Sequence, residues 1–199
     1  GGYVTAIRAS QLGLKTAVIE KESLGGVCLN WGCIPTKALL KSAQVFEYIS
    51  HAADYGIKVS SAKADFGGMV ERSRGVANGM SNGIKFLMKK NKITIIEGFG
   101  KLARGKKVEV TDSKGKVESY TADHIILATG GRARSLPNVP IDNKKIIGYR
   151  KAMTMEKQPK KMVVIGAGAI GAEFAYFYNA IGTEVTVVEY MPQGLVPRE

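Results

Sequence analysis

The stretch KKMVVIGAGAIGAEFAYFYNAIGTEVTVVEY, residues 160–190, carries the most decisive pattern in the chain. Its apolar run at 162–165 predicts a strand, and GAGAIG at 166–171 predicts a tight turn that opens a helix reaching about Ile181. A second strand follows and ends at Glu189. Strand, glycine turn, helix and strand in this order are typical of a βαβ unit in an α/β fold.

The glycines and the acid of this unit predict a dinucleotide site. Gly166 suits the tight turn, Gly168 lets the backbone approach the phosphates, and Gly171 allows close packing of helix and strand. A carboxylate at Glu189 can accept hydrogen bonds from a free ribose 2′-hydroxyl but repels a 2′-phosphate. We therefore expect this site to bind NAD rather than NADP.

The start of the chain repeats the second half of the same pattern. GGYVTAIRASQLG, residues 1–13, predicts a buried helix with a glycine end, and LKTAVIE, residues 14–20, predicts a short buried strand ending in Glu20. Glycines that open a helix, followed by a strand and an acid, favour a second nucleotide site. The preceding strand and the first glycine of this unit are not in the sequence.

The middle of the chain predicts a long helix and a small sheet. Residues 66–90 are helix-prone, and short strands predicted at 93–97, 108–111 and 117–120 are separated by turn-forming residues. Further on, HIILATGGRAR at 124–134 predicts a buried strand at 125–127 that runs into a glycine pair. SLPNVPID then reads as a linker to the second unit.

Composition describes a globular chain: 45% of its 199 residues are hydrophobic and 23% are charged. It has no apolar run of about 18 residues and no leader pattern, so we expect a cytoplasmic protein that does not enter a membrane. The net charge of +12 could suit a nucleic acid. The lysines lie in polar turns without stacking aromatics, however, and we expect no nucleic-acid partner.

The only two cysteines lie in GGVCLNWGCIPTK, residues 25–37. A structural disulfide is unusual in the cytoplasm, and zinc needs about four ligands, for which His51 and His124 offer no clustered spacing, so we expect no metal site. Two unrelated buried thiols remain an alternative, although Asn30 and the flanking glycines are poor core residues. A redox pair is the favoured interpretation.

Spacing sets a condition on that interpretation. Five residues of regular helix rise about 7.5 Å, whereas bridged cysteines need Cα atoms about 4.4 to 6.8 Å apart. Residues 28–33 therefore cannot form an undistorted helix, and we expect Asn30 and Gly32 to allow a bent turn. Pro35 suits the first turn of a helix from Ile34 to about Tyr48, whose free amides would favour a thiolate.

These segments together resemble the flavin-dependent pyridine nucleotide-disulfide oxidoreductases, and among them the dihydrolipoamide dehydrogenases. The resemblance rests on GGVCLNWGCIPTK, the opening GGYVTAIRA, the ATGG turn and GAGAIGAE, and it covers essentially the whole chain. Trp31 stands where the family more usually has a small aliphatic residue. The resemblance implies a Rossmann-like FAD-binding domain with a small antiparallel β insertion, followed by the start of a Rossmann-like NAD-binding domain.

The resemblance also implies roles for individual residues. Cys28 would be the interchange thiol that attacks the substrate, Cys33 the thiol that faces the flavin, and Lys37 a neighbour of the reactive flavin edge. The positions that match FAD-binding residues are Gly2, Glu20, Lys21, Gly25, Gly26, Cys28, Lys37, Gly100, Thr129, Gly130 and Gly131. The positions that match NAD-binding residues are Gly166, Gly168, Ile170, Gly171, Glu173 and Glu189.

Family members are much longer than this chain, so the resemblance implies an incomplete FAD-binding domain at 1–143 and an incomplete NAD-binding domain at 144–199. The C-terminal dimerisation domain and its histidine–glutamate pair would be absent, and we expect little flavin retention and no turnover from the chain alone. A complete enzyme would oxidise dihydrolipoamide on a lipoyl-bearing protein, as a homodimer within 2-oxo acid dehydrogenase complexes. A mercuric or glutathione reductase and a non-catalytic nucleotide-binding fragment are the alternatives.

Overall fold

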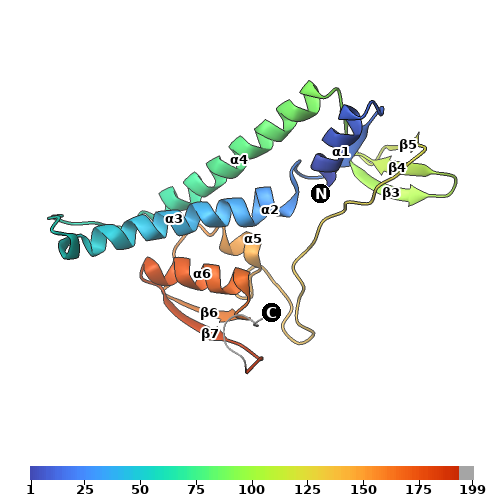
Figure 1. Ribbon diagram of the computed structural model, residues 1–199. Coiled ribbons are helices and arrows are strands. Elements are labelled where there is room, and N and C mark those ends of the chain that lie inside the picture. The colour runs from blue at the N-terminus through green and yellow to red at the C-terminus, as the bar shows by residue number, and fades with distance from the viewer. Residues whose placement is uncertain (193–199) are drawn as a thin grey trace. The chain divides into compact units, whose positions relative to one another are not determined.

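The computed structural model describes residues 1–192, and residues 193–199 lie outside the described part (Figure 1). The chain groups into two compact units, one of residues 1–30 and 78–132, the other of residues 31–77 and 133–192. The elements, in chain order, are α1 (Gly2–Gln11), β1 (Ala17–Glu20), α2 (Gly26–Trp31), α3 (Cys33–Ser50), η1 (Ala52–Tyr55), α4 (Phe66–Lys90), β2 (Thr94–Glu97), β3 (Phe99–Ala103), β4 (Lys107–Thr111), β5 (Val117–Thr121), α5 (Tyr149–Ala152), β6 (Lys161–Ile165), α6 (Ala169–Ala180) and β7 (Glu184–Val188).

The first unit is built around a short parallel strand pair. β1 and β2 run parallel, in a register that sets Ala17 opposite Thr94 and Glu20 opposite Glu97, and α1 contacts β1. Parallel strands need a helical crossover, and α4 precedes β2 in the chain. The hydrophobic cluster of this unit is formed by α1, the loop before α2, α2 itself, α4 and the approach to β2: Ala6, Leu24, Leu29, Ile84, Met88 and Ile93.

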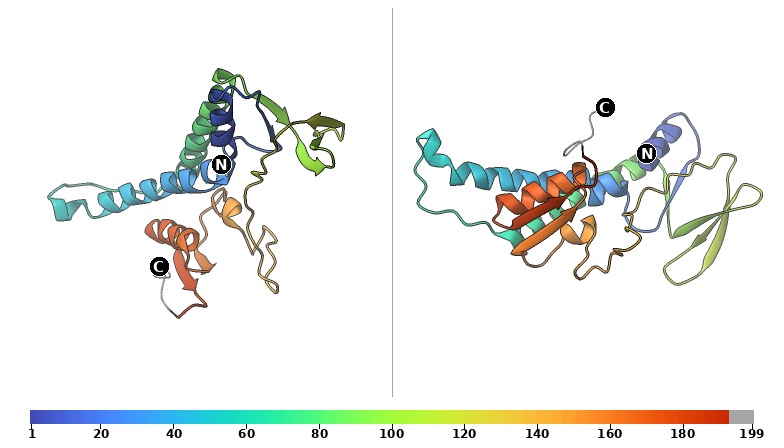
Figure 2. Two further views of the ribbon diagram at one scale, coloured as in Figure 1. Left: turned by 45° about the vertical axis from the view of Figure 1, so that its right-hand side comes forward. Right: turned by 90° about the horizontal axis from the view of Figure 1, so that it is seen from below.

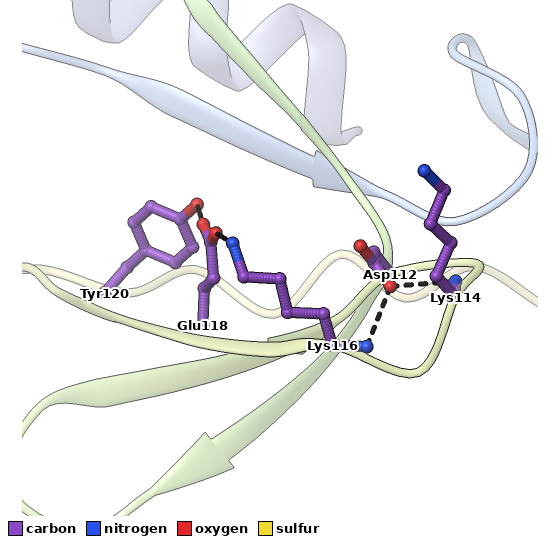
Figure 3. Close-up of polar contacts among 5 residues, drawn as sticks. All are labelled: Asp112, Lys114, Lys116, Glu118 and Tyr120. Atoms are coloured by element: carbon purple, nitrogen blue, oxygen red, sulfur yellow. Dashed lines mark hydrogen bonds and ion pairs between the residues drawn. The ribbon is translucent and has the colours of Figure 1, made fainter.

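An antiparallel sheet is confirmed, in the order β3-β4-β5, but its strands are only partly those predicted. The strands predicted at 108–111 and 117–120 are β4 and β5, whereas the one predicted at 93–97 is β2 of the parallel pair, and β3 was not predicted. The second turn of the antiparallel sheet is closed by the Asp112 carboxylate, which accepts hydrogen bonds from the backbone N–H groups of Lys114 and Lys116 (Figure 3). Such a side-chain turn reverses the chain without a type I′ glycine pair. On β5, Glu118 pairs with the Lys116 ammonium and accepts a hydrogen bond from the Tyr120 hydroxyl.

The second unit contains the complete βαβ pattern, as the sequence predicts. β6 and β7 pair in parallel from Lys161 opposite Glu184 to Ile165 opposite Val188, and α6 packs on both strands. Both views of Figure 2 show α3 alongside α6. The core lies between these helices, with Phe66, Phe177 and Tyr178 in mutual ring contact. Its other buried members are Leu39, Ala43, Ala152, Met153, Phe174 and Ile181.

Truncation of Leu39 tests this core. Its side chain is 0% exposed on α3, so Leu39→Ala should lower the free energy of unfolding by about 2–5 kcal/mol through lost burial and a cavity. Val45 lies on the same helix and is 44% exposed, and Val45→Ala should therefore change that free energy by less than about 1 kcal/mol. Denaturant unfolding followed by circular dichroism measures both, and equal losses would contradict the packing described here.

The strand predicted at 125–127 is wrong. These residues have no regular secondary structure, and Ile126 and Leu127 are 66% and 70% exposed. A strand needs a neighbour for its backbone hydrogen bonds, and within residues 1–192 the parallel sheet of this unit contains only β1 and β2. The strand predicted as buried at the end of 14–20 is β1, and it is only half-buried, with β2 as its one neighbouring strand within the described residues. The domain boundary predicted at 143/144 stays a prediction.

Candidate functional site

The two cysteines form a disulfide at a break between two helices. Both Cys28 and Cys33 are disulfide-bonded, and they are the only cysteines of the chain. Helix α2 ends at Trp31 and α3 begins at Cys33, while Gly32 between them has φ −138° and ψ −120°, which is not helical. The predicted distortion is confirmed, and it is confined to one residue.

Asn30 does not loosen this turn, contrary to the sequence-based expectation. It lies inside α2 and is buried, and its Nδ2 donates hydrogen bonds to the backbone oxygens of Leu24 at 2.9 Å and Gly26 at 3.0 Å. A buried amide with two acceptors fixes the backbone around it. Asn30 therefore holds the start of α2 against the preceding loop, and the freedom to bend comes from Gly32 alone.

Cys33 occupies the first position of an 18-residue helix. The N-terminal amides of a helix carry partial positive charge and favour an anion, so this position suits a thiolate. Lys37 follows one turn later and forms an ion pair with Glu173 of α6. The structure thus brings together two of the predicted site residues, in a pair whose side chains are 62% and 28% exposed.

The glycine loop before α6 is shaped for close backbone approach. Gly166 has φ +99°, a conformation that residues with a side chain rarely adopt. A Cβ on Gly171 would lie 2.0 Å from the Gly166 backbone oxygen, whereas one on Gly168 would meet nothing within 4 Å. Gly171 therefore serves packing, and Gly168 leaves open space at the start of the helix.

The predicted acid lies beside this loop. Glu189 follows β7, and its Oε2 accepts a hydrogen bond of 2.6 Å from the Ala167 backbone N–H. Hydrogen bonds from Ala167 and from Met191 hold the pKa of the Glu189 carboxyl below its ordinary value of 4.5. An ionised carboxylate next to an open glycine loop at a helix N-terminus fits the ribose and pyrophosphate of NAD. Ile170 is exposed on the first turn of the same helix.

The nucleotide residues predicted at the N-terminus lie in the first unit. A Cβ on Gly2 would come 3.2 Å from the Ala128 Cβ, so α1 closely approaches the segment that leads into Thr129. Gly130 has φ +73°, and a Cβ on either Gly130 or Gly131 would meet nothing within 4 Å. The start of α1 therefore lies near the glycine turn at 130–131, and both glycines of that turn have open space where a side chain would be.

Glu20 and its neighbours form a second group in this unit. The Glu20 Oε1 accepts a hydrogen bond of 2.9 Å from the Glu22 backbone N–H, and the Lys21 ammonium lies 5.5 Å from the centre of the Phe99 ring. A Cβ on Gly100 would come 3.1 Å from Ile19 Cγ2, so packing alone already requires a small residue there. Gly100 thus does not need a ligand to explain it.

Gly25 lies in the loop before α2, and Gly26 is the first residue of that helix. Gly25 has φ +110°, and a Cβ there would come 3.0 Å from the Leu29 side chain. The open glycine turn at 130–131, the close approach at Gly2 and the Glu20 carboxylate at the end of β1 together fit the adenosine and pyrophosphate of a dinucleotide such as FAD.

None of the helices within residues 1–192 is long and apolar enough to cross a membrane. Within the same residues, no group of three or more histidine, cysteine and acidic side chains is arranged to hold a metal ion. A contact that sequence reasoning missed is the approach of Arg74 and Arg150 to the Trp31 ring, at 4.3 and 5.1 Å from its centre.

Comparisons with known proteins agree with this geometry. A family model described as "Pyridine nucleotide-disulphide oxidoreductase" matches residues 1–199. A dihydrolipoyl dehydrogenase of Rhizobium etli is 51% identical to this chain, and the match covers 96% of this chain and 43% of that protein. A dihydrolipoyl dehydrogenase of Zymomonas mobilis is 48% identical, and the match covers 100% of this chain and 42% of that protein. A leghemoglobin reductase of Vigna unguiculata is 47% identical, and the match covers 96% of this chain and 37% of that protein.

Among solved structures, LpdA from Mycobacterium tuberculosis matches with a TM-score of 0.88 and 24% identity, over 100% of this chain and 43% of that one. This likeness supports the α/β fold. The chain spans less than half the length of the relatives named here. Because the family model covers all 199 residues, the chain belongs to the pyridine nucleotide-disulphide oxidoreductase family.

Proposed function

We propose that this chain carries the redox disulfide and both nucleotide sites of an enzyme that oxidises dihydrolipoamide and reduces NAD, with FAD as the intermediate carrier. The observation that carries the proposal is the Cys28–Cys33 disulfide, placed at a helix break in a family member that also has a NAD-type glycine loop. Relatives named dihydrolipoyl dehydrogenase, 48–51% identical to this chain, support the choice of substrate.

The electron balance of the first half-reaction needs only the two cysteines and the substrate. A dihydrolipoamide thiolate attacks the Cys28 sulfur, the Cys28–Cys33 bond breaks, and Cys33 leaves as a thiolate. The second lipoyl sulfur then attacks the lipoyl sulfur bound to Cys28, which closes the lipoamide disulfide and releases Cys28. The protein gains two electrons, and the two substrate protons pass to Cys28 and to a base or solvent.

The protein's own residues prepare this exchange. The start of α3 stabilises the Cys33 thiolate, because the helix amides carry partial positive charge. FAD, when bound, would supply the two-electron redox chemistry between the dithiol and NAD. In this scheme Lys37, which is paired with Glu173, would supply a positive charge to the flavin site.

The remaining site assignments belong to the same proposal. FAD would be held by Gly2, Glu20, Lys21, Gly25, Gly26, Gly100, Thr129, Gly130 and Gly131. NAD would be held by Gly166, Gly168, Ile170, Gly171, Glu173 and Glu189. The FAD-binding part would span residues 1–143 and the NAD-binding part residues 144–199. The complete enzyme would be a cytoplasmic homodimer that serves lipoyl-bearing proteins of 2-oxo acid dehydrogenase complexes.

A disulfide reductase that uses NADPH, such as a glutathione reductase, is the second candidate. The described residue that discriminates between the two candidates is Glu189, whose carboxylate lies beside the Gly166–Gly168 loop. A 2′-phosphate placed there would meet a negative charge, which disfavours NADP. The ionised state of Glu189 therefore favours the NAD-dependent reaction.

Substitution of Glu189 tests this preference. Glu189→Gln should lower the affinity for NADH about tenfold, because a charged acceptor for the ribose hydroxyls is lost, and should narrow the gap between NADH and NADPH. The depressed pKa means that the carboxylate persists below pH 4.5, so wild-type affinity should stay flat as the pH falls from neutral towards that value. Fluorescence titration measures both, and equal NADPH binding by the unaltered protein would contradict the proposal.

The proposed function is tested by adding a thiol reductant and measuring which groups of the enzyme become reduced. The complete enzyme, with FAD bound, receives dihydrolipoamide or glutathione in anaerobic solution, and protein thiols and reduced flavin are measured separately. We expect dihydrolipoamide to reduce the disulfide and the flavin, with NAD as the preferred final acceptor. Reduction by NADPH with release of electrons to glutathione disulfide would replace the proposal by its alternative.

A further inference from the structure

Trp31 makes contacts that the redox chemistry itself does not need. It is the last residue of α2 and lies between the two cysteines in the sequence. The Arg74 Cζ, from α4, is 4.3 Å from the centre of its ring, and the Arg150 Cζ, from α5, is 5.1 Å away. Guanidinium groups within about 6 Å of an indole centre attract it through cation–π interaction.

The Trp31 side chain is partly buried. The Trp31 Nε1 is buried and has no hydrogen-bond partner within residues 1–192, an arrangement that disfavours burial of the ring. Burial also lowers the pKa of the Arg74 guanidinium. The cation–π contacts with the two arginines act in the opposite direction and favour this position of the ring.

Arg74 continues the contact into the core of the second unit. Its Nη1 donates to the Met153 Sδ at 3.6 Å, and Met153 is completely buried in the cluster that includes Phe177. Arg150 belongs to α5, whose residue Ala152 lies in the same cluster. The helix break is therefore connected through one indole ring to the packed part of the unit.

We propose that Trp31 is a positioning residue for the disulfide. Held by Arg74 and Arg150, it fixes the end of α2 beside Gly32, so that the Cys28 and Cys33 sulfurs stay within bonding distance when they are reduced. The inference rests on the proposed redox role of the cysteines. Its consequence is thermodynamic: a fixed turn raises the effective concentration of one thiol at the other and makes the disulfide harder to reduce.

The experiment measures the equilibrium of the protein with mixtures of reduced and oxidised dithiothreitol, scored by alkylation and mass spectrometry. In Trp31→Leu the constant for reduction should rise about tenfold, equivalent to about 30 mV for a two-electron couple. Trp31→Phe keeps a ring for the guanidinium groups and removes the unpaired N–H, and should stay within about twofold of the unaltered protein.

Lysine substitutions separate stacking from charge. Arg74→Lys and Arg150→Lys keep the positive charge but lose the planar group, and each should raise the constant about threefold. Arg72→Lys is the matched control, because Arg72 lies on the same helix as Arg74 and donates at 2.7 Å to the Ala38 backbone oxygen instead. It should change the constant by less than about 1.5-fold.

The inference is overturned if Trp31→Leu folds and shifts the constant less than about twofold, or if Arg72→Lys shifts it as much as Arg74→Lys. Should Trp31→Leu fail to fold, the two lysine variants decide: a shift of about threefold in each supports the inference, and no shift in either overturns it. Dithiothreitol is not the proposed substrate, so failure of the proposed function would appear separately, as absence of exchange between dihydrolipoamide and the unaltered disulfide.

Discussion

Replacement of Cys33 by serine is expected to abolish electron transfer from dihydrolipoamide to NAD in the FAD-loaded enzyme. A serine oxygen cannot form the disulfide, so no bond is present that could break and accept the electron pair, and the rate should fall by at least about a thousandfold. A stopped assay of NADH formation measures the loss. Turnover above a tenth of the unaltered rate in Cys33→Ser would contradict the redox role of the pair.

The matched variant Cys28→Ser should be equally inactive, but the two variants should differ in how fast the remaining cysteine reacts with lipoamide. In Cys33→Ser the remaining Cys28 is the proposed interchange thiol, so it should form a mixed disulfide with oxidised lipoamide. In Cys28→Ser the remaining Cys33 should do so much more slowly, because its proposed partner is the flavin. Mass spectrometry of the protein after incubation with lipoamide distinguishes the two, and the reverse pattern would exchange the roles of the cysteines.

Gly171→Ala should be the most damaging single-methyl change in the nucleotide loop. The new Cβ would lie 2.0 Å from the Gly166 backbone oxygen, and backbone cannot move aside as a side chain can. The turn and the start of α6 must then shift, with an expected loss of about 2–4 kcal/mol in the free energy of unfolding and of NADH binding.

Gly168→Ala in the same loop is the control. Its Cβ would meet nothing within 4 Å, and its φ of −63° suits alanine, so the free energy of unfolding should change by less than about 1 kcal/mol. NADH affinity should still fall about tenfold, because the methyl group would occupy space that the pyrophosphate needs. Stability and affinity that change together in both variants would show that Gly168 is also a packing residue.

The local pattern of the chain was sufficient to predict most of the fold. The run from Lys161 to Val188 contains its own strand, turn, helix and strand, so every signal lies within one short segment and agrees with the others. The helix at 66–90 was predicted with its observed bounds, and the strands at 108–111 and 117–120 within one residue at either end. Turn residues such as Asp112 mark these ends because their side chains close the turn themselves.

The errors arise where structure depends on residues far away in the chain. Ile126 and Leu127 have the composition of a strand, but the described sheet offers them no partner. The polarity of Asn30 suggested a flexible turn, whereas two backbone oxygens make it a buried anchor. The contacts of Arg74 and Arg150 with Trp31 join three segments, and no periodicity in the sequence connects them.

For the candidate site too, local motifs were predictable from the sequence and contacts between distant segments were not. Sequence motifs located the cysteines, the glycine loop and Glu189, because each is defined by local spacing. The ion pair of Lys37 with Glu173 and the hydrogen bond of Glu189 with Ala167 required coordinates, since they depend on how α3, α6 and β7 pack.

The most direct test of the central claim is a count of protein thiols before and after anaerobic incubation with dihydrolipoamide, in the absence of any nucleotide. We expect the protein to start with no alkylatable thiol and to gain two, at Cys28 and Cys33, for each dihydrolipoamide that is oxidised. Cysteines that remain resistant to dihydrolipoamide while dithiothreitol reduces them readily would contradict it.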